Sequence, residues 1–220
     1  MKRTIGSDVK VIEYSGRIDF FNCLTHAAGA ALSVVGLFVM LSRAEGLRST
    51  FSAIVYGIAL IAVYTVSAVY HGLKVGEAKR IARLVDHSTV PLLIAGTATP
   101  CALISLYNVS EIHGIVVFTM GWFCALFGVV SKLFFFEKLK KATMAVYIVS
   151  GAVMLLCAVP LLGEIDKGAF GQIVFGSVLY VIGAVFCGLG VKRPYLHVVF
   201  HLFVMAASAV HFYVIMTHGF

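Results

Sequence analysis

Residues 51–73 read FSAIVYGIALIAVYTVSAVYHGL, and this stretch of 23 residues contains no Asp, Glu, Lys or Arg. A helix needs roughly 20 mostly apolar residues to cross the hydrocarbon core of a bilayer. Lipid offers no hydrogen bonds to exposed backbone groups, so such a segment is stable there as a helix. The stretch therefore predicts a transmembrane helix.

The composition of the whole chain agrees with that prediction. Of its 220 residues, 60% are hydrophobic and only 12% are charged, and the mean hydropathy is +1.00. Soluble domains carry about 25% charged residues, so this chain has too few to cover a water-facing surface. The net charge of +7 does not indicate nucleic acid, because the basic residues lie in short gaps between apolar runs rather than on one face of a soluble domain.

Seven apolar runs are long enough to span. They predict an all-α, seven-helix membrane bundle formed by residues 22–220, preceded by an N-terminal segment at residues 1–21. The expected spans are 22–42, 51–73, 84–106, 114–134, 142–162, 170–190 and 195–218. We expect a multi-pass protein of the plasma membrane, which in a bacterium is the cytoplasmic membrane.

The basic residues predict the orientation of the bundle, because Lys and Arg collect on the cytoplasmic side. With seven spans, 14 of the 17 basic residues fall on the side of the N-terminus and only Arg43, Arg48 and Lys167 on the other. This bias places the N-terminus inside and the C-terminus outside. It argues against a G-protein-coupled receptor, whose N-terminus lies outside. A retinal protein is excluded as well, because residues 195–220 contain no lysine for a Schiff base.

Ionisable side chains inside a membrane span are costly, so each is a candidate functional residue. Seven ionisable residues are expected inside spans. Six of them lie near the cytoplasmic ends of their spans, so residues that are distant in the sequence share one depth. The six are His26, His71, Asp86, His87, His197 and His201, and the seventh is His211.

The spacing of three of these histidines indicates a metal site. His197 and His201 are four residues apart, which places both imidazoles on one face of a helix. Such a pair can bind a single zinc ion, and His71 at the same depth can supply a third nitrogen. Three histidines with an open fourth position are typical of catalytic zinc. The expected cofactor is therefore Zn²⁺, held by His71, His197 and His201.

Further polar residues surround the expected metal site. Asp86 is a candidate general base that accepts a proton from water, with a structural bond to Arg83 or to a histidine as the alternative. Ser67 lies one turn before His71 and is a second candidate catalytic residue. Asp19, Asn22 and His26 are expected to support the site from the first span. For Ser67 and Asn22 an interhelical hydrogen bond is the equal alternative.

The remaining histidines and the cysteines are expected to be packing residues. His211 lies ten residues beyond His201, roughly 15 Å deeper along the helix, and so cannot share the site. His113 and His218 have the same interpretation, and His87 is expected to face its neighbours or solvent. The five cysteines are odd in number and form no CxxC pair, which indicates neither disulfides nor a thiolate metal site.

Four motifs occur in order on the expected spans. They are NCLTH at 22–26, SAVYH at 67–71, Asp86-His87-Ser88 followed by IAGTATP at 94–100, and PYLHVVFHLFVMAASAVHF at 194–212. Together they resemble the hemolysin III-like family within the progestin and adipoQ receptor superfamily, over residues 19–212. The resemblance implies a seven-helix fold with the N-terminus inside. It also implies zinc on His71, His197 and His201, with Asp86 near the bound water. Where the family has Glu before the first motif, this chain has Asp19.

The resemblance implies more than one activity. One branch is linked to amide hydrolysis of ceramide-like lipids, and the bacterial branch is named for lysis of red cells and connected with membrane homeostasis. Three functions therefore stay open: a zinc-dependent hydrolase of lipid amides or esters, a lipid receptor with structural zinc, and a cytolytic pore. The expected partners are membrane lipids, with a homo-oligomer as a further possibility and no nucleic acid.

Overall fold

The computed structural model describes residues 5, 6 and 8–219, and within them seven helices are long and apolar enough to cross a membrane. Their bounds are α1 Gly16–Arg43, α2 Gly46–Gly72, α3 Glu77–Pro100, α4 Glu111–Phe135, α5 Lys140–Ala158, α6 Lys167–Gly190 and α7 Tyr195–His218. A π-helix, η1 Cys101–Leu106, extends α3, and a short 3₁₀ turn, η2 Val159–Leu161, extends α5. The all-α fold predicted from the sequence is confirmed.

Most of the helices are longer than the apolar runs that predicted them, whereas α7 has the expected bounds and α5 ends earlier, at Ala158. Helix α3 begins at Glu77 rather than near residue 84, and α1 begins at Gly16 rather than near residue 22. The first turn of α3 is polar and contains an ion pair in which Arg80 Nη2 lies 2.5 Å from Glu77 Oε1. Pairs three residues apart stabilise a helical turn, but hydropathy alone does not detect such a turn.

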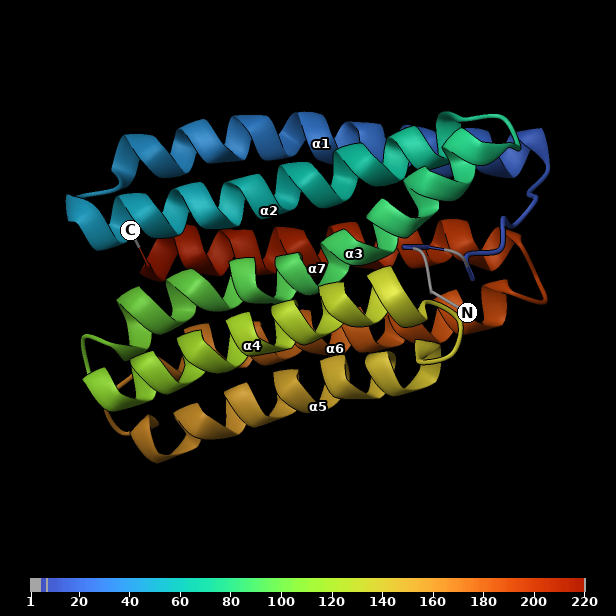
Figure 1. Cartoon of the computed structure of the whole chain (residues 1–220). Helices are drawn as coiled ribbons and strands as arrows, with labels where there is room; N and C mark the ends of the chain where they lie inside the picture. The colour runs from blue at the N-terminus through green and yellow to red at the C-terminus, as the bar shows by residue number, and fades with distance from the viewer. Residues whose placement is uncertain (1–4, 7, 220) are drawn as a thin grey trace.

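The seven helices form one bundle with their axes roughly along a common direction (Figure 1). Each helix from α1 to α5 packs on the next, and α7 packs on both α6 and α1. The N-terminal segment lies at one end of the bundle, and α7 finishes at the opposite end (Figure 1). These are called the N-terminal and C-terminal ends below. Helices α2 and α3 have the largest share of buried residues, and α1, α5 and α6 have the smallest.

Small residues bring the central helices close together. A Cβ at Gly96 on α3 would lie 2.5 Å from the Cβ of Ala59 on α2. A Cβ at Gly128 on α4 would lie 2.6 Å from the Cβ of Pro91, which stands inside α3. Close backbone approach through small residues is the usual way that membrane helices associate, because lipid supplies no hydrophobic force between them.

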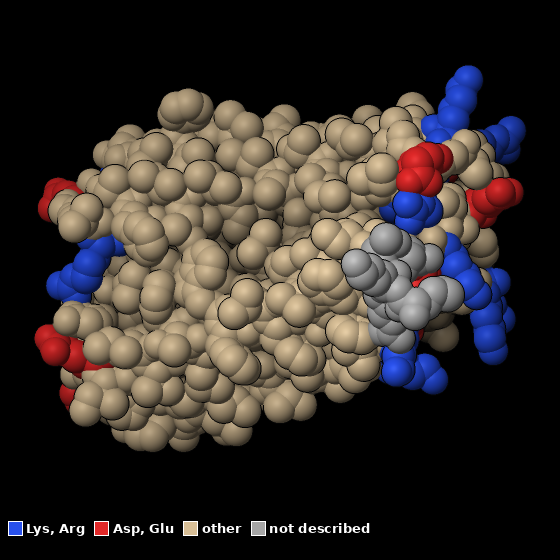
Figure 2. Space-filling model, viewed as in Figure 1, with Lys and Arg blue, Asp and Glu red and all other residues tan. Residues whose placement is uncertain are grey.

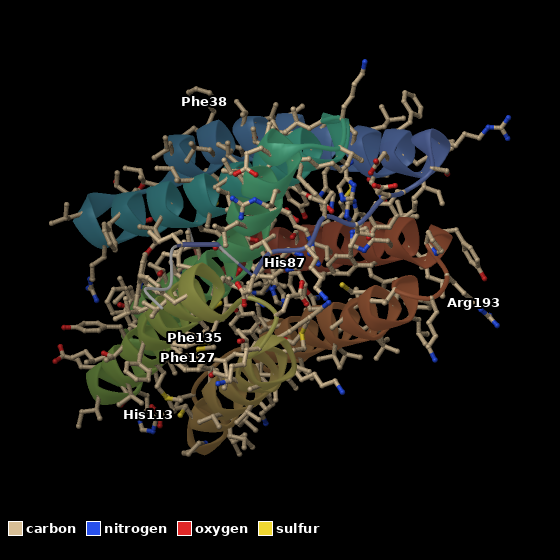
Figure 3. The ribbon with its side chains drawn as sticks, turned by 45° about the vertical axis from the view of Figure 1, so that its right-hand side comes forward. Phe38, His87, His113, Phe127, Phe135 and Arg193 are labelled. Carbon is tan, nitrogen blue, oxygen red and sulfur yellow. The ribbon has the colours of Figure 1, made fainter. Side chains whose placement is uncertain are left out.

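Charged side chains collect at the two ends, and the broad middle of the visible face carries none (Figure 2). Most Lys and Arg side chains in this view are at the N-terminal end (Figure 2). In the side-chain view, Phe38 projects outward from α1, and His113 and Arg193 mark opposite ends of the bundle (Figure 3). An apolar girdle between two charged ends is the surface expected of a protein that spans a bilayer.

The charge bias generates a topology prediction. A reporter that folds only outside the cytoplasm should be active when inserted after Asp166, which precedes α6, and silent when inserted after Arg193, which precedes α7. Reporter activity in cells, normalised to expression, measures both. Activity after Arg193 with silence after Asp166 would mean that the N-terminus lies outside.

Candidate metal centre

Three histidines from two helices converge at the N-terminal end of the bundle. His71 stands in the last turn of α2, and His197 and His201 stand in the first two turns of α7. One ring nitrogen from each residue lies within 4.8 Å of the other two, and the three side chains could hold a metal ion. The sequence predicted these three residues as the ligand set.

The orientation of His71 suits a metal ligand. Its Nδ1 lies 2.9 Å from Asp19 Oδ1. Because a carboxylate oxygen accepts, this nitrogen carries the proton and donates a hydrogen bond to Asp19. The other nitrogen, Nε2, is buried and has no hydrogen-bond partner among the described residues. A buried nitrogen lone pair without a partner is unfavourable, whereas a carboxylate–histidine pair is the common arrangement behind a metal-ligating imidazole. The donor set therefore fits a metal ion.

The second oxygen of Asp19 binds a buried lysine. Lys79 Nζ donates to Asp19 Oδ2 at 2.7 Å and to the carbonyl oxygen of Leu73 at 3.1 Å. The Lys79 side chain is only 1% exposed. Sequence reasoning counted Lys79 only as a topology signal, because a lysine between two spans normally faces water. The structure instead places it beneath Asp19, where it keeps the carboxylate ionised and in position.

Helix α1 orients His201 as well as His71. His201 Nδ1 lies 3.3 Å from the backbone carbonyl oxygen of Asn22 and donates a hydrogen bond to it. Asn22 is fully buried, and its side-chain nitrogen lies 3.4 Å from His71 Nδ1. Asp19 and Asn22, one turn apart on α1, thus contact two of the three candidate ligands.

His26 lies directly against the candidate ligands. Its ring stacks on His201 with centroids 3.6 Å apart and contacts the edge of Tyr64 at 5.1 Å. Neither of its ring nitrogens has a hydrogen-bond partner in the described part of the chain. His26 is not one of the three residues whose nitrogens converge. It therefore packs the inner wall of the centre rather than completing the ligand set.

Ser67 and Asp86 form a second polar pair near the centre. Ser67 is buried one turn before His71 on α2, and its side chain interacts with Asp86 on α3. The converging group comprises His71, His197 and His201 and does not include Asp86. Asp86 therefore pairs with Ser67 on the neighbouring helix and lies outside the converging group.

The described residues before α1, 5, 6 and 8–15, form an extended segment that we call the N-terminal strap. The amide of Gly6 donates to the carbonyl oxygen of Leu133 at 3.0 Å, and the amide of Glu137 donates to Asp8 Oδ2 at 3.1 Å. Val9 is buried in a small apolar cluster with Leu84 and Phe136. The strap therefore packs across the ends of α3 and α4.

Tyr14 of the strap covers the histidines. Its ring stacks on His197 with centroids 5.3 Å apart and tilts against His71 at 5.6 Å. Burial raises the pKa of the Tyr14 phenol well above its usual value, so the hydroxyl stays protonated and can donate a hydrogen bond. Sequence reasoning missed Tyr14, since nothing in the pattern of a polar N-terminal segment indicates that it folds back over the bundle.

A cavity of about 420 Å³ gives access to the centre from the side. Asp19 and His71 line its polar wall, and Phe20, Cys23 and Val75 line its apolar part. Phe20 and Val75 are largely exposed on the surface of the bundle. The cavity therefore joins the apolar outer face of α1 to the candidate ligand His71.

The other histidines lie outside the centre. His211 Nε2 donates to the carbonyl oxygen of Ile173 on α6 at 3.0 Å, which is the packing role expected of it. His87 contacts the edge of Phe136 at 4.9 Å, and Figure 3 labels it within the bundle. His113 Nδ1 lies 2.8 Å from the hydroxyl of Ser110, and His218 Nδ1 lies 3.8 Å from Asp166 Oδ2.

The convergence of the three imidazoles predicts metal content. Purified protein should carry close to one transition-metal ion per chain, and each of His71→Ala, His197→Ala and His201→Ala should remove most of it. His211→Ala is the matched control, because it also removes a buried α7 histidine. Elemental mass spectrometry measures the stoichiometry. Equal loss in His211→Ala and His201→Ala would show that the ligand set is wrong.

The two oxygens of Asp19 allow a sharper test of its role. Asp19→Asn should weaken metal binding by about 10–100-fold, the usual effect of losing the partner behind a ligating histidine. Lys79→Met removes the other contact of the same carboxylate but keeps the bond to His71. It should lower thermal stability with a much smaller change in metal affinity. Competition with a chelator of known affinity measures both variants, and similar affinities in the two would contradict this role of Asp19.

Comparison with known proteins agrees with this architecture. A family model described as Haemolysin-III related matches residues 17–212. The chain is 32% identical to "Hemolysin-3" of Bacillus cereus over 199 residues, which cover 89% of each protein. It is 29% identical to the "Hemolysin-3 homolog" of Bacillus subtilis over 198 residues, covering 89% of this chain and 91% of that one.

Similarity extends to an animal protein. The chain is 28% identical to the human "Monocyte to macrophage differentiation factor" over 204 residues, covering 88% of this chain and 81% of the relative. With the seven membrane-spanning helices, the bacterial matches identify a multi-pass protein of the plasma membrane. The match over residues 17–212 includes all the candidate ligands and the helices that position them, and the chain therefore belongs to the haemolysin-III related family.

Proposed function

We propose that this protein is a zinc-dependent hydrolase that cleaves an amide or ester bond in a membrane lipid. The observation that carries the proposal is the convergence of His71, His197 and His201 within 4.8 Å of one another, at one end of a bundle that spans the membrane. Lipid is the substrate class that such a position favours.

The nature of the ligands favours zinc over other ions. Three imidazoles without a thiolate suit zinc in a catalytic rather than a closed structural site. Zinc bound in this way lowers the pKa of water and polarises a carbonyl group. The chain's own contribution is to orient the ligands, which Asp19 does for His71 and the Asn22 carbonyl does for His201.

Asp86 is the group best suited to accept a proton from the attacking water. Its carboxylate interacts with the side chain of Ser67. A carboxylate in this role later returns the proton to the leaving amine or alcohol. Ser67 and Asp86 come from different helices, so the relative position of α2 and α3 sets the geometry of the pair.

The surroundings of the centre support a substrate that enters from the lipid. The N-terminal strap covers the histidines from the end of the bundle, with Tyr14 stacked on His197. The cavity beside α1 opens among exposed apolar residues such as Phe20 and Val75. An acyl chain can lie along that apolar surface while its carbonyl approaches His71.

Asp86 separates an enzyme from a protein that only binds metal. Asp86→Asn should retain the metal and the fold but lower the rate of hydrolysis by about 10²–10⁴-fold, the usual effect of losing a general base. Long-chain N-acyl amides and esters in liposomes serve as substrates, with release of the fatty acid measured by mass spectrometry. Glu77→Gln is the control, because Glu77 is an exposed acid on the same helix.

One result would contradict the proposed activity, and another would contradict the role of Asp86 alone. Zinc-loaded wild-type protein that turns over none of a broad panel of lipid amides and esters is not a lipid hydrolase, and a receptor with structural zinc would then be favoured. Full activity in Asp86→Asn would leave hydrolysis intact and assign the general base to another residue.

A further inference from the structure

A second cavity lies at the C-terminal end of the bundle, away from the candidate metal centre. Its volume is about 540 Å³, and it is bounded by the end of α1, the start of α2 and the π-helix η1. Arg43, Arg48, Ser49 and Asn108 supply polar groups to its wall, and Leu103 and Ile104 supply an apolar surface. Neither the candidate metal centre nor the proposed hydrolysis uses these residues.

The backbone of one wall is unusual. Residues Cys101–Leu106 form a π-helix directly after Pro100. π-Helical turns are rare and occur frequently at functional sites, because the wider turn changes the direction of the side chains that follow. Leu103 and Ile104, which line the cavity, both belong to this turn. The irregular backbone and the cavity thus coincide.

Two arginines meet at this cavity. Arg43 ends α1 and Arg48 stands in the first turn of α2. The third Lys or Arg residue at the C-terminal end of the bundle is Lys167. Among the residues that the structure describes, neither arginine has an acidic partner within ion-pair distance. The Arg48 guanidinium stacks on the Tyr107 ring with 4.4 Å to the ring centroid. This contact restrains it at the cavity wall.

The charge of the cavity suits a monoanion. Glu45 also lines it, so two arginines and one carboxylate leave a net charge of one positive unit. Arginine presents a planar fork of donors that matches two oxygens of a phosphate. The hydroxyl of Ser49 and the amide of Asn108 are additional donors. A phosphodiester carries one negative charge at neutral pH and has two free oxygens to accept these bonds.

We propose that this cavity binds the phosphodiester headgroup of a membrane phospholipid from the leaflet at the C-terminal end. The ends of the helices lie at the depth of lipid headgroups. Leu103 and Ile104 provide the apolar surface against which the first carbons of the acyl chains pack. A soluble phosphate ester would use the arginines but would gain nothing from that apolar wall.

The experiment compares four probes with delipidated protein in detergent. They are a short-chain phosphatidylglycerol, the matching diacylglycerol without phosphate, glycerol phosphate and inorganic phosphate. Native mass spectrometry and thermal stabilisation measure binding. The phospholipid should bind at least about tenfold more tightly than each of the other three probes. Equal binding of diacylglycerol would exclude phosphate recognition, and equal binding of inorganic phosphate would exclude a lipid site.

Substitutions assign that binding to the cavity. Arg43→Gln and Arg48→Gln should each weaken phospholipid binding by about tenfold, the usual effect of losing one charge-assisted hydrogen bond. Lys167→Gln is the matched control, because it removes the third basic residue of the same end outside the cavity. It should leave binding unchanged. Unaltered binding in the Arg43→Gln/Arg48→Gln double variant would overturn the proposal.

Two readouts separate this inference from misfolding and from the proposed hydrolysis. The Arg43→Lys/Arg48→Lys variant keeps both charges and should retain part of the binding even if the glutamine variants fold poorly. If the lysine variant folds but its affinity for the phospholipid is no higher than its affinity for inorganic phosphate, this cavity is not the phospholipid site. Bound metal and lipid hydrolysis should be unchanged in all arginine variants, so failure here is distinguishable from failure of the hydrolase proposal.

Discussion

The carboxylate of Asp19 joins three helices at the point where the candidate metal centre forms. One oxygen accepts a hydrogen bond from His71 on α2, and the other accepts a hydrogen bond from Lys79 on α3. Removing one partner of a buried ion pair costs about 3–5 kcal/mol, because the remaining charge is left uncompensated. The pair therefore holds α1, α2 and α3 in register. The same contact leaves His71 Nε2 as the nitrogen available to a metal.

The membrane explains why polar groups are concentrated in this way. Each polar side chain within lipid needs a partner from the protein, since no water is present to supply one. At the N-terminal end, α1 supplies these partners: Asp19 for His71, and the carbonyl of Asn22 for His201. Further along the bundle, Tyr64 donates to Ser208 at 2.7 Å, joining α2 to α7. Helix α1, which has few buried residues, thus positions the metal centre through one polar edge.

The two ends of the bundle have different chemistry. The N-terminal end combines a nearly closed group of histidines with a strap and a lateral opening. The C-terminal end has a wider cavity whose charge comes from two arginines. A separation of this kind allows one end to act on a lipid while the other contacts the opposite leaflet.

The sequence alone determined the all-α fold, the seven spans and the family, and it predicted the three histidines that the structure brings together. Those features depend on local rules: about 20 apolar residues cross a bilayer, and histidines four apart share a helix face. The expected shared depth of His71, His197 and His201 followed from the spans alone. Only the tertiary structure decided the pairing of Asp19 with Lys79, the stacking of His26 on His201 and the return of Tyr14 over His197. These contacts depend on how each helix is rotated and on where a polar segment folds back, and packing between distant residues sets both.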